Sequence, residues 1–240
     1  PPTIAGVVLA YRKKYLLGGI VTALFIALQI QSNHIQKSYY FMFVILFFVG
    51  AYFEDAYKKK ELPHFFKASA VLALAAVVGV CINISNLYHT YEYSKETMRG
   101  KSELKQEGAA ASQTSSGLDR DYITNWSYGI GETLTLLVPN VKGGGSGSTM
   151  SQSEAAMAKA NPMYNGIYSQ LPQYFGEQPW TAGPVYVGAF VMFLFVLGCF
   201  IVKGPLKWAL LGATIFSILL SWGKNFMGLT DFFIDYVPMY

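Results

Sequence analysis

The fold is decided by residues 68–91, which read ASAVLALAAVVGVCINISNLYHTY and contain no charged side chain in 24 positions. A helix needs about 17–25 mostly apolar residues to cross the hydrocarbon core of a bilayer, so this run is long enough for one span. Four more uncharged runs are also long enough to be spans. The two shorter ones are included because flanking lysines can extend their ammonium groups toward the water. These runs cover residues 15–36, 38–53, 178–202 and 208–223. One small soluble core could not cover five such runs, so the sequence predicts an all-α, polytopic membrane protein.

The same runs divide the chain into segments. The chain begins at Pro1, not Met, inside an apolar run, and we therefore expect it to be a piece of a longer protein. The predicted segments are the tail of a truncated transmembrane helix (1–11), three transmembrane helices (15–91), an extracytoplasmic loop subdomain (92–177), two transmembrane helices (178–223) and the start of the next extracytoplasmic segment (224–240).

The composition agrees with a membrane protein and excludes several other classes. Hydrophobic residues make up 52% of the chain and charged residues only 13%, about half of the charge of an average globular protein. This balance argues against a disordered chain and against a nucleic-acid-binding arm. The two cysteines, Cys81 and Cys199, both lie in apolar runs, which leaves no disulfide framework and no cysteine metal site.

The distribution of lysine and arginine predicts the orientation in the membrane. Nine basic residues lie in three short loops that alternate along the chain, whereas the opposite short segments contain only Lys37 and Lys224. The nine are Arg12, Lys13, Lys14, Lys58, Lys59, Lys60, Lys67, Lys203 and Lys207. Because short cytoplasmic loops carry the basic excess, these loops are predicted to face the cytoplasm and residues 92–177 the outside.

The long outer loop has its own predicted elements. Residues 88–107 favour a helix that continues out of the third span, because they are rich in Glu and Lys and contain no proline. Residues 119–138 favour an interfacial helix or a helix–loop–helix. The KGGGSGS run at 142–148 is typical of a flexible linker, and residues 153–159 favour a short helix.

The main group of candidate site residues lies at the start of the aromatic part of this loop, in GLDRDYITNWSY at 117–128. Its members are Asp119, Arg120, Asp121, Trp126 and Tyr128, with Glu132 just beyond. The two aspartates could bind a divalent cation, the only cofactor that the residues suggest. Arg120 matches phosphate geometry, and the aromatic rings could stack on a sugar. A helix over 121–132 would place Asp121, Tyr128 and Glu132 near one face. The alternative is a capped interfacial helix with one salt bridge and an aromatic belt.

Two smaller groups complete the candidates. His89, Glu92, Glu96 and Arg99 follow one another at spacings of three or four positions where the third span leaves the membrane, which suits either a metal site or ordinary charge pairing along a helix. Asp231 and Asp235 either approach the outer loop or belong to the next element. No span carries an ionisable residue near its centre, which argues against an ion-coupled transporter.

Three runs carry a resemblance to a known family. They are GLDRDYITNWSYGIGETLTLLVPN at 117–140, QPWTAGPVYVGAF at 178–190 and SWGKNFMGLTDFFIDYVPMY at 221–240. They resemble the YfhO family of bacterial multi-span membrane proteins. The resemblance implies a GT-C-like glycosyltransferase architecture in the bacterial cytoplasmic (inner) membrane. It also implies a catalytic carboxylate in an outer loop that precedes Pro1.

The function expected from this resemblance is transfer of a sugar from a polyprenyl-phosphate carrier to a cell-envelope acceptor at the outer face. The expected partners are membrane lipid, the polyprenyl-phosphate-linked sugar and an envelope polymer, with no nucleic acid. The alternatives are a lipid or polymer transporter and a non-catalytic membrane scaffold. Fold-level analogy alone does not decide among them.

Overall fold

The protein is described by a computed structural model that covers residues 1–97, 120–179 and 181–237. Over these ranges the secondary structure is helical, and the only β pairing is an isolated antiparallel bridge between Thr149 and Pro172. The chain divides into two compact units. Unit 1 comprises Pro1–Leu118 and Val202–Thr214, and unit 2 comprises Asp119–Ile201 and Ile215–Tyr240.

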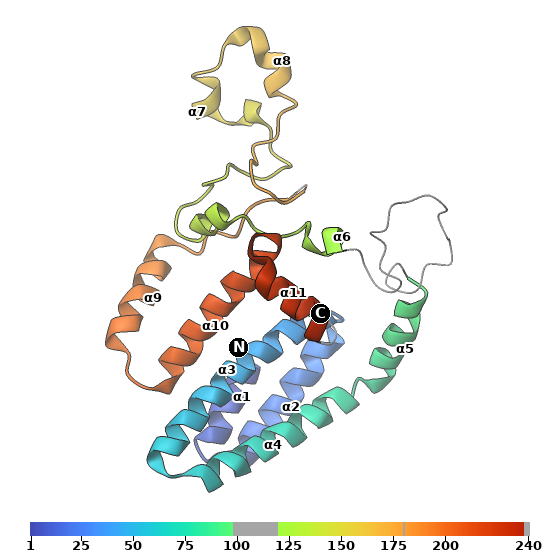
Figure 1. The fold of residues 1–240 in the computed structure, drawn as a ribbon, viewed down its shortest axis with the longest axis vertical. Helices are drawn as coiled ribbons and strands as arrows, with labels where there is room; N and C mark the ends of the chain where they lie inside the picture. Colours follow the sequence, from blue (N-terminus) through green and yellow to red (C-terminus); the bar gives the residue numbers. More distant parts are fainter. Residues whose placement is uncertain (98–119, 180, 238–240) are drawn as a thin grey trace. The chain divides into compact units, whose positions relative to one another are not determined.

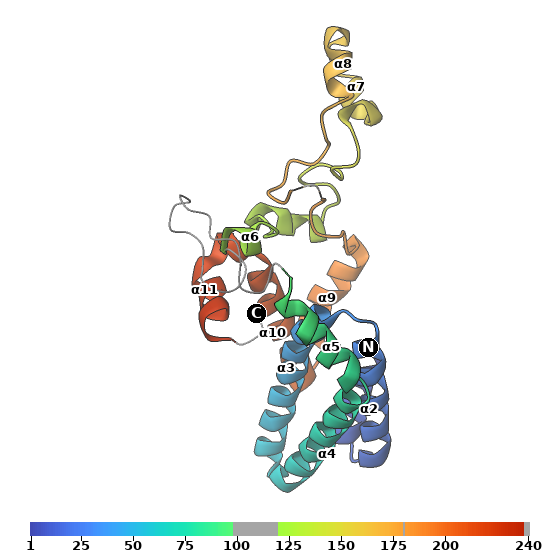
Figure 2. The same ribbon diagram turned by 90° about the vertical axis from the view of Figure 1, so that its right-hand side faces the viewer.

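Unit 1 contains a bundle of apolar helices and a more polar helix at Ile84–Lys95 (Figures 1 and 2). Its helices are α1 (Pro2–Tyr11), α2 (Tyr15–Gln31), α3 (Ile35–Lys59), α4 (Leu62–Cys81), α5 (Ile84–Lys95) and the first part of α10 (Pro205–Ser221). Helices α2 and α4 each contact the three other helices of the group α1–α4, so these two form the centre of the bundle. Its core includes Tyr11, which stacks on Tyr52 with ring centroids 4.4 Å apart and on Phe65 at 5.6 Å.

Glycines allow α1 and α2 to approach each other closely. A Cβ atom added to Gly18 would lie 2.6 Å from the backbone nitrogen of Ala10, and one added to Gly6 would lie 2.4 Å from Thr22 Oγ1. Gly79 of α4 has the same role against α2, because its added Cβ would lie 2.9 Å from the carbonyl oxygen of Ala23. Small residues at helix crossings are typical of membrane bundles, where van der Waals packing drives helix association.

The third predicted span is interrupted. The uncharged run at 68–91 predicts one continuous helix, but α4 ends at Cys81 and α5 begins at Ile84. Between them, the Asn83 side-chain amide donates to the carbonyl oxygen of Ala27 on α2 at 3.0 Å, which ties the break to the neighbouring helix. The helix predicted over residues 88–107 is too long, because α5 ends at Lys95 and the described residues Glu96 and Thr97 form a turn and a bend; residues 98–107 lie outside the described ranges.

Unit 2 combines short helical turns with longer apolar helices. Its α-helices are α6 (Arg120–Thr124), α7 (Glu154–Met157), α8 (Asn165–Tyr168), α9 (Ala189–Ile201), the end of α10 and α11 (Met227–Tyr236). Its 3-10 helices are η1 (Ile130–Leu136), η2 (Met150–Gln152), η3 (Pro162–Tyr164) and η4 (Gly223–Phe226). The predicted helix at 153–159 corresponds to α7, which Ser153 caps through a hydrogen bond from the Ala156 amide.

Two predictions about unit 2 need correction. Residues 119–138 do not form one helix, since α6 and η1 are separated by a turn, so the helix–loop–helix alternative applies. The fourth uncharged run begins at Gln178 and is expected to become helical near Pro184, but its helix begins only at Ala189 and has 13 residues, or about 20 Å. The segment just before α9 is hydrogen-bonded to the predicted outer loop; for example, the Val187 amide donates to the Leu136 carbonyl oxygen at 3.2 Å.

By length and composition, two of the described helices can cross a membrane, namely α3 and α4. A third span results if α10 and the following η4–α11 segment, which are bent by 111°, count as one. Helices α1, α2 and α9 are shorter apolar helices. Every residue of α9 is uncharged and none is buried, so its surface requires cover by lipid or by other protein.

The close approach of α1 and α2 generates a prediction with an internal control. Gly18→Ala should lower the free energy of unfolding by about 1–3 kcal/mol, because its methyl group overlaps the α1 backbone. Gly50→Ala in α3 has open space around its Cβ and should raise that free energy by about 0.5–1 kcal/mol through helix propensity. Denaturant unfolding of the purified chain in detergent measures both. Equal effects of the two substitutions would contradict the packing argument.

Candidate functional site

Three segments of unit 2 meet around the side chain of Glu132. The first contains residues 126–133, the second residues 174–178 and the third residues 221–225. Glu132 is the most deeply buried acidic residue described, with 1% of its surface exposed. A buried carboxylate requires hydrogen-bond donors or a cation, so its surroundings determine what it can do.

The carboxylate of Glu132 accepts three hydrogen bonds, with at least one on each oxygen. Its Oε1 accepts from the Tyr174 hydroxyl at 2.6 Å and from the Glu177 amide at 3.0 Å, and its Oε2 accepts from the Gly129 amide at 2.9 Å. The last bond also caps the start of η1. Burial and the bond to Glu132 together raise the pKa of Tyr174 to about 12, so its hydroxyl remains a donor at any physiological pH. This arrangement holds a charge but leaves no carboxylate oxygen open to a substrate.

The third segment is tied to the first by four hydrogen bonds. Trp222 Nε1 donates to Thr133 Oγ1 at 2.8 Å, and the Tyr128 amide donates to the Ser221 carbonyl oxygen at 2.9 Å. The two other bonds run from the Lys224 amide to Ser127 Oγ at 2.9 Å and from Asn225 Nδ2 to the Tyr128 carbonyl oxygen at 3.0 Å. Gly223 is required in this contact, because its φ is +42° and an added Cβ would lie 1.9 Å from Ser127 Oγ.

Glu177 forms the exposed rim of this cluster. Its Oε2 accepts from Asn225 Nδ2 at 3.0 Å and lies 3.4 Å from Lys224 Nζ. The bond from Asn225, followed by the interaction with Lys224, holds the pKa of Glu177 below its ordinary value. The Glu177 carboxylate is therefore ionised at neutral pH and already paired with Asn225 and Lys224.

Arg120 begins α6, and its guanidinium lies between two carboxylates of α11. Nη1 donates to Asp231 Oδ1 at 2.8 Å, and Nη2 donates to Asp235 Oδ1. The aspartates are four residues apart on one helix, so they project from the same face. The three side chains are 40–45% exposed. The alternative in which Asp231 and Asp235 approach the outer loop is therefore confirmed.

The remaining candidates in this loop have separate positions. Trp126 is half-exposed, and its carbonyl oxygen accepts from Gln178 Nε2. Tyr128 is partly buried, which raises its pKa, with the charge of Glu132 adding to the effect. Asp121 lies on α6, and Asp119 is outside the described residues. The single helix face proposed for Asp121, Tyr128 and Glu132 is wrong, because the turn between α6 and η1 interrupts the helix.

The metal hypotheses gain no support from the part of the chain that is described. No group of three His, Cys, Asp or Glu side chains in it could hold a metal ion, and Asp119 falls outside it. On α5, Glu92 pairs with Lys95 at 2.7 Å, and His89 packs its ring against Tyr88. Arg99 also lies outside the described residues. Glu92 therefore takes part in charge pairing along a helix, which was the alternative to a metal site.

Sequence reasoning missed several residues that build the cluster. Tyr174, Glu177, Trp222 and Asn225 contribute side chains from positions far along the chain, and no local pattern marks them. One signal was available: Glu132 is the only charged residue in 122–141, so its burial, and hence its need for donors, could have been anticipated.

The occupancy of Glu132 predicts an effect of removing its charge. In Glu132→Gln, either orientation of the amide places an N–H group against a backbone N–H of Gly129 or Glu177. We expect a loss of about 2–3 kcal/mol in the free energy of unfolding. Hydrogen exchange at residues 126–136 and 174–179 should also become faster. The control Glu154→Gln removes an exposed carboxylate on α7 and should change neither quantity. Protection unchanged in Glu132→Gln would show that the carboxylate does not hold these segments.

The pKa of Tyr174 predicts a pH dependence of stability. The folded chain retains this proton up to about pH 12, whereas an unfolded chain releases it near pH 10. Above pH 10 the unfolded state thus binds fewer protons, and the free energy of unfolding should fall by about 2–3 kcal/mol between pH 10 and 12. Tyr174→Phe should remove this part of the fall, and Tyr164→Phe, at an exposed position, should retain it. Denaturant unfolding across pH 9–12 measures the difference, and identical slopes in the two variants would contradict the assignment.

Comparisons of the chain with family models, with curated proteins and with solved structures found no match. The resemblance to the YfhO family therefore rests on the three quoted runs. Parts of all three lie in the described region of unit 2, and they are joined there by the hydrogen bonds around Glu132 and Tyr128. The functional argument consequently depends on the geometry of this unit.

Proposed function

We propose that the chain is part of a polytopic protein of the bacterial cytoplasmic membrane, similar to the YfhO family, that transfers a sugar from a polyprenyl-phosphate carrier to an envelope acceptor. In this proposal unit 2 lies at the outer face and contributes to the acceptor site. The observation that carries the proposal is the exposed pair of carboxylates, Asp231 and Asp235, held by Arg120. Sugar transfer to a hydroxyl is promoted by a general base that accepts its proton, and a carboxylate can have this role.

The apolar helices support a location in the membrane. Helices α3 and α4 are long enough to span it, and α2, α4 and α9 expose large apolar side chains along their lengths. Contiguous exposed apolar surface on this scale is unusual for a soluble monomer. A lipid-linked sugar donor is available only at such a membrane, which connects the location to the chemistry.

The carboxylate pair suits the binding of a hydroxyl-bearing acceptor better than the binding of phosphate. Both nitrogens at the fork of Arg120 are used by the aspartates, and the three side chains carry a net negative charge. This changes the role proposed for Arg120: it is a positioning residue for the carboxylates, and the donor phosphate requires another cation. Each exposed ion pair contributes at most about 1 kcal/mol, so the pair can open to admit a substrate.

The test uses the protein in its native membrane, with sugar transfer to the envelope polymer as the readout. Asp231→Asn or Asp235→Asn should lower transfer about 100-fold or more if that carboxylate, rather than the one that the resemblance implies before Pro1, accepts the proton. Arg120→Lys should give a smaller loss, because lysine cannot donate along two parallel directions. Glu154→Gln is the control for removal of an exposed carboxylate from unit 2. Normal transfer by both Asn variants, with normal protein levels, would exclude the acceptor site.

A non-catalytic scaffold is the second candidate, and the occupancy of Glu132 favours it. Among the described residues of unit 2, the most buried carboxylate accepts three hydrogen bonds that join separate segments of the fold. A scaffold predicts that both Asn variants retain normal transfer and that only substitutions in the Glu132 cluster, through lost folding, have an effect. The same set of variants thus separates the two functions.

A further inference from the structure

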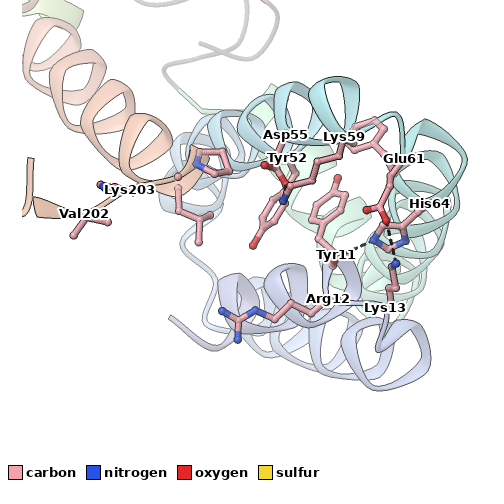
Figure 3. A pocket seen from close by; sticks show the side chains of 15 residues that line it. Tyr11, Arg12, Lys13, Tyr52, Asp55, Lys59, Glu61, His64, Val202 and Lys203 are labelled. Atoms are coloured by element: carbon pink, nitrogen blue, oxygen red, sulfur yellow. Dashed lines mark hydrogen bonds and ion pairs between the residues drawn. The ribbon is translucent and has the colours of Figure 1, made fainter.

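A cavity of about 540 Å³ opens within unit 1, at the end of the bundle where the basic loops lie (Figure 3). It is bordered by the C-terminal ends of α1 and α3, the first turn of α4 and the turn at residues 202–204 that precedes α10. Its volume is within the range of small-molecule sites in proteins. It belongs to unit 1 alone and contains none of the residues in the cluster of unit 2.

The inner wall of the cavity is aromatic and fixed in position. Tyr11 is buried between Tyr52 and Phe65, and its hydroxyl is bonded to Ser69 at 2.9 Å. His64 Nε2 lies 2.9 Å from the Tyr11 carbonyl oxygen, which can only accept, so Nε2 carries the proton. In the neutral ring the other nitrogen, Nδ1, accepts from the Tyr15 hydroxyl at 2.6 Å. The wall is thus preorganised, and His64 contributes no free donor to the cavity.

The charged lining has more cations than anions. Four cationic side chains and two carboxylates border the cavity. Lys13 pairs with Glu61 at 3.3 Å, and Lys59 pairs with Asp55 at 2.7 Å. Arg12 and Lys203 have no ion pair with any residue in the described ranges. Two positive charges therefore remain uncompensated.

Both of these cations belong to residues that line the cavity. In Figure 3 the Arg12 side chain extends away from the Lys13–Glu61 pair. Lys13 and Gly204 adopt positive φ values of 68° and 112°, which make the sharp turns that bring residues 12 and 203 to the cavity. The first turn of α4 lacks a side-chain cap, so its amide groups add positive potential there.

We propose that this cavity binds the phosphate group of an anion, with Arg12 and Lys203 as its cationic contacts. Guanidinium and ammonium groups are the usual phosphate donors in proteins, and the aromatic wall would face the remainder of the ligand. The phosphate can come from an anionic phospholipid headgroup or from a phosphate ion in solution. The proposal concerns the end of unit 1 and is independent of the function proposed for unit 2.

The experiment compares two double variants that change the net charge equally. Arg12→Gln with Lys203→Gln removes the unpaired cations, and Lys14→Gln with Lys58→Gln removes cations of the same basic loops that do not line the cavity. In nanodiscs, native mass spectrometry counts phosphatidylglycerol retained against a phosphatidylcholine background. In detergent, calorimetry measures binding of inorganic phosphate. The cavity variant should lose at least tenfold in affinity, and the control variant less than threefold.

The two arms identify the source of the phosphate. Saturable retention of phosphatidylglycerol without binding of inorganic phosphate assigns the cavity to a lipid headgroup, and saturable binding of inorganic phosphate assigns it to a soluble anion. The single variant Lys203→Gln, in an exposed turn, serves as a second test if the double variant unfolds. Absence of saturable binding by the wild type in both arms, or equal losses in the cavity and control variants, would overturn the proposal.

Discussion

A carboxylate removed from water must regain the hydrogen bonds that water supplied, and the architecture of unit 2 depends on how Glu132 meets this requirement. Leaving the charge unpaired would cost several kcal/mol. Donors from Gly129, Tyr174 and Glu177 replace the water, and they belong to segments more than 40 residues apart. One buried charge therefore fixes a long-range contact in a region with few regular helices.

The packing of unit 1 follows a different rule. Its interior contains few polar side chains, and the closeness of the backbones at Gly6, Gly18 and Gly79 determines which helix faces meet. Where a polar side chain does enter, as at Asn83, it bonds to the carbonyl oxygen of a neighbouring helix and interrupts its own helix. Apolar packing elsewhere tolerates small changes in side-chain size. At these three glycines, the Cβ atom of any other residue would overlap neighbouring atoms.

The helical class and the apolar helices could be predicted from the sequence, because each depends on local composition. The exact ends of these helices could not be predicted. Helix α4 begins at Leu62 and includes Lys67, although charge counting places the start of the span at residue 68. The run at 142–148 has the composition of a linker, but the Lys142 carbonyl oxygen accepts from the Phe175 amide and the Ser148 carbonyl oxygen from the Gln173 amide. Those bonds depend on residues about 25–33 positions away, which no local pattern contains.

The role of a cation is determined by its partners as much as by its chemical type. The guanidinium of Arg120 and its neighbours in sequence led us to expect a phosphate ligand. In the structure, however, this guanidinium donates to Asp231 and Asp235. Arg12 and Lys203 suggested only the orientation in the membrane, yet they border a cavity and have no carboxylate partner in the described ranges. A phosphate group would gain more from the second pair, because no existing ion pair has to be broken first. The distribution of counter-charges, which only the folded chain reveals, therefore assigns phosphate binding to unit 1 and carboxylate positioning to unit 2.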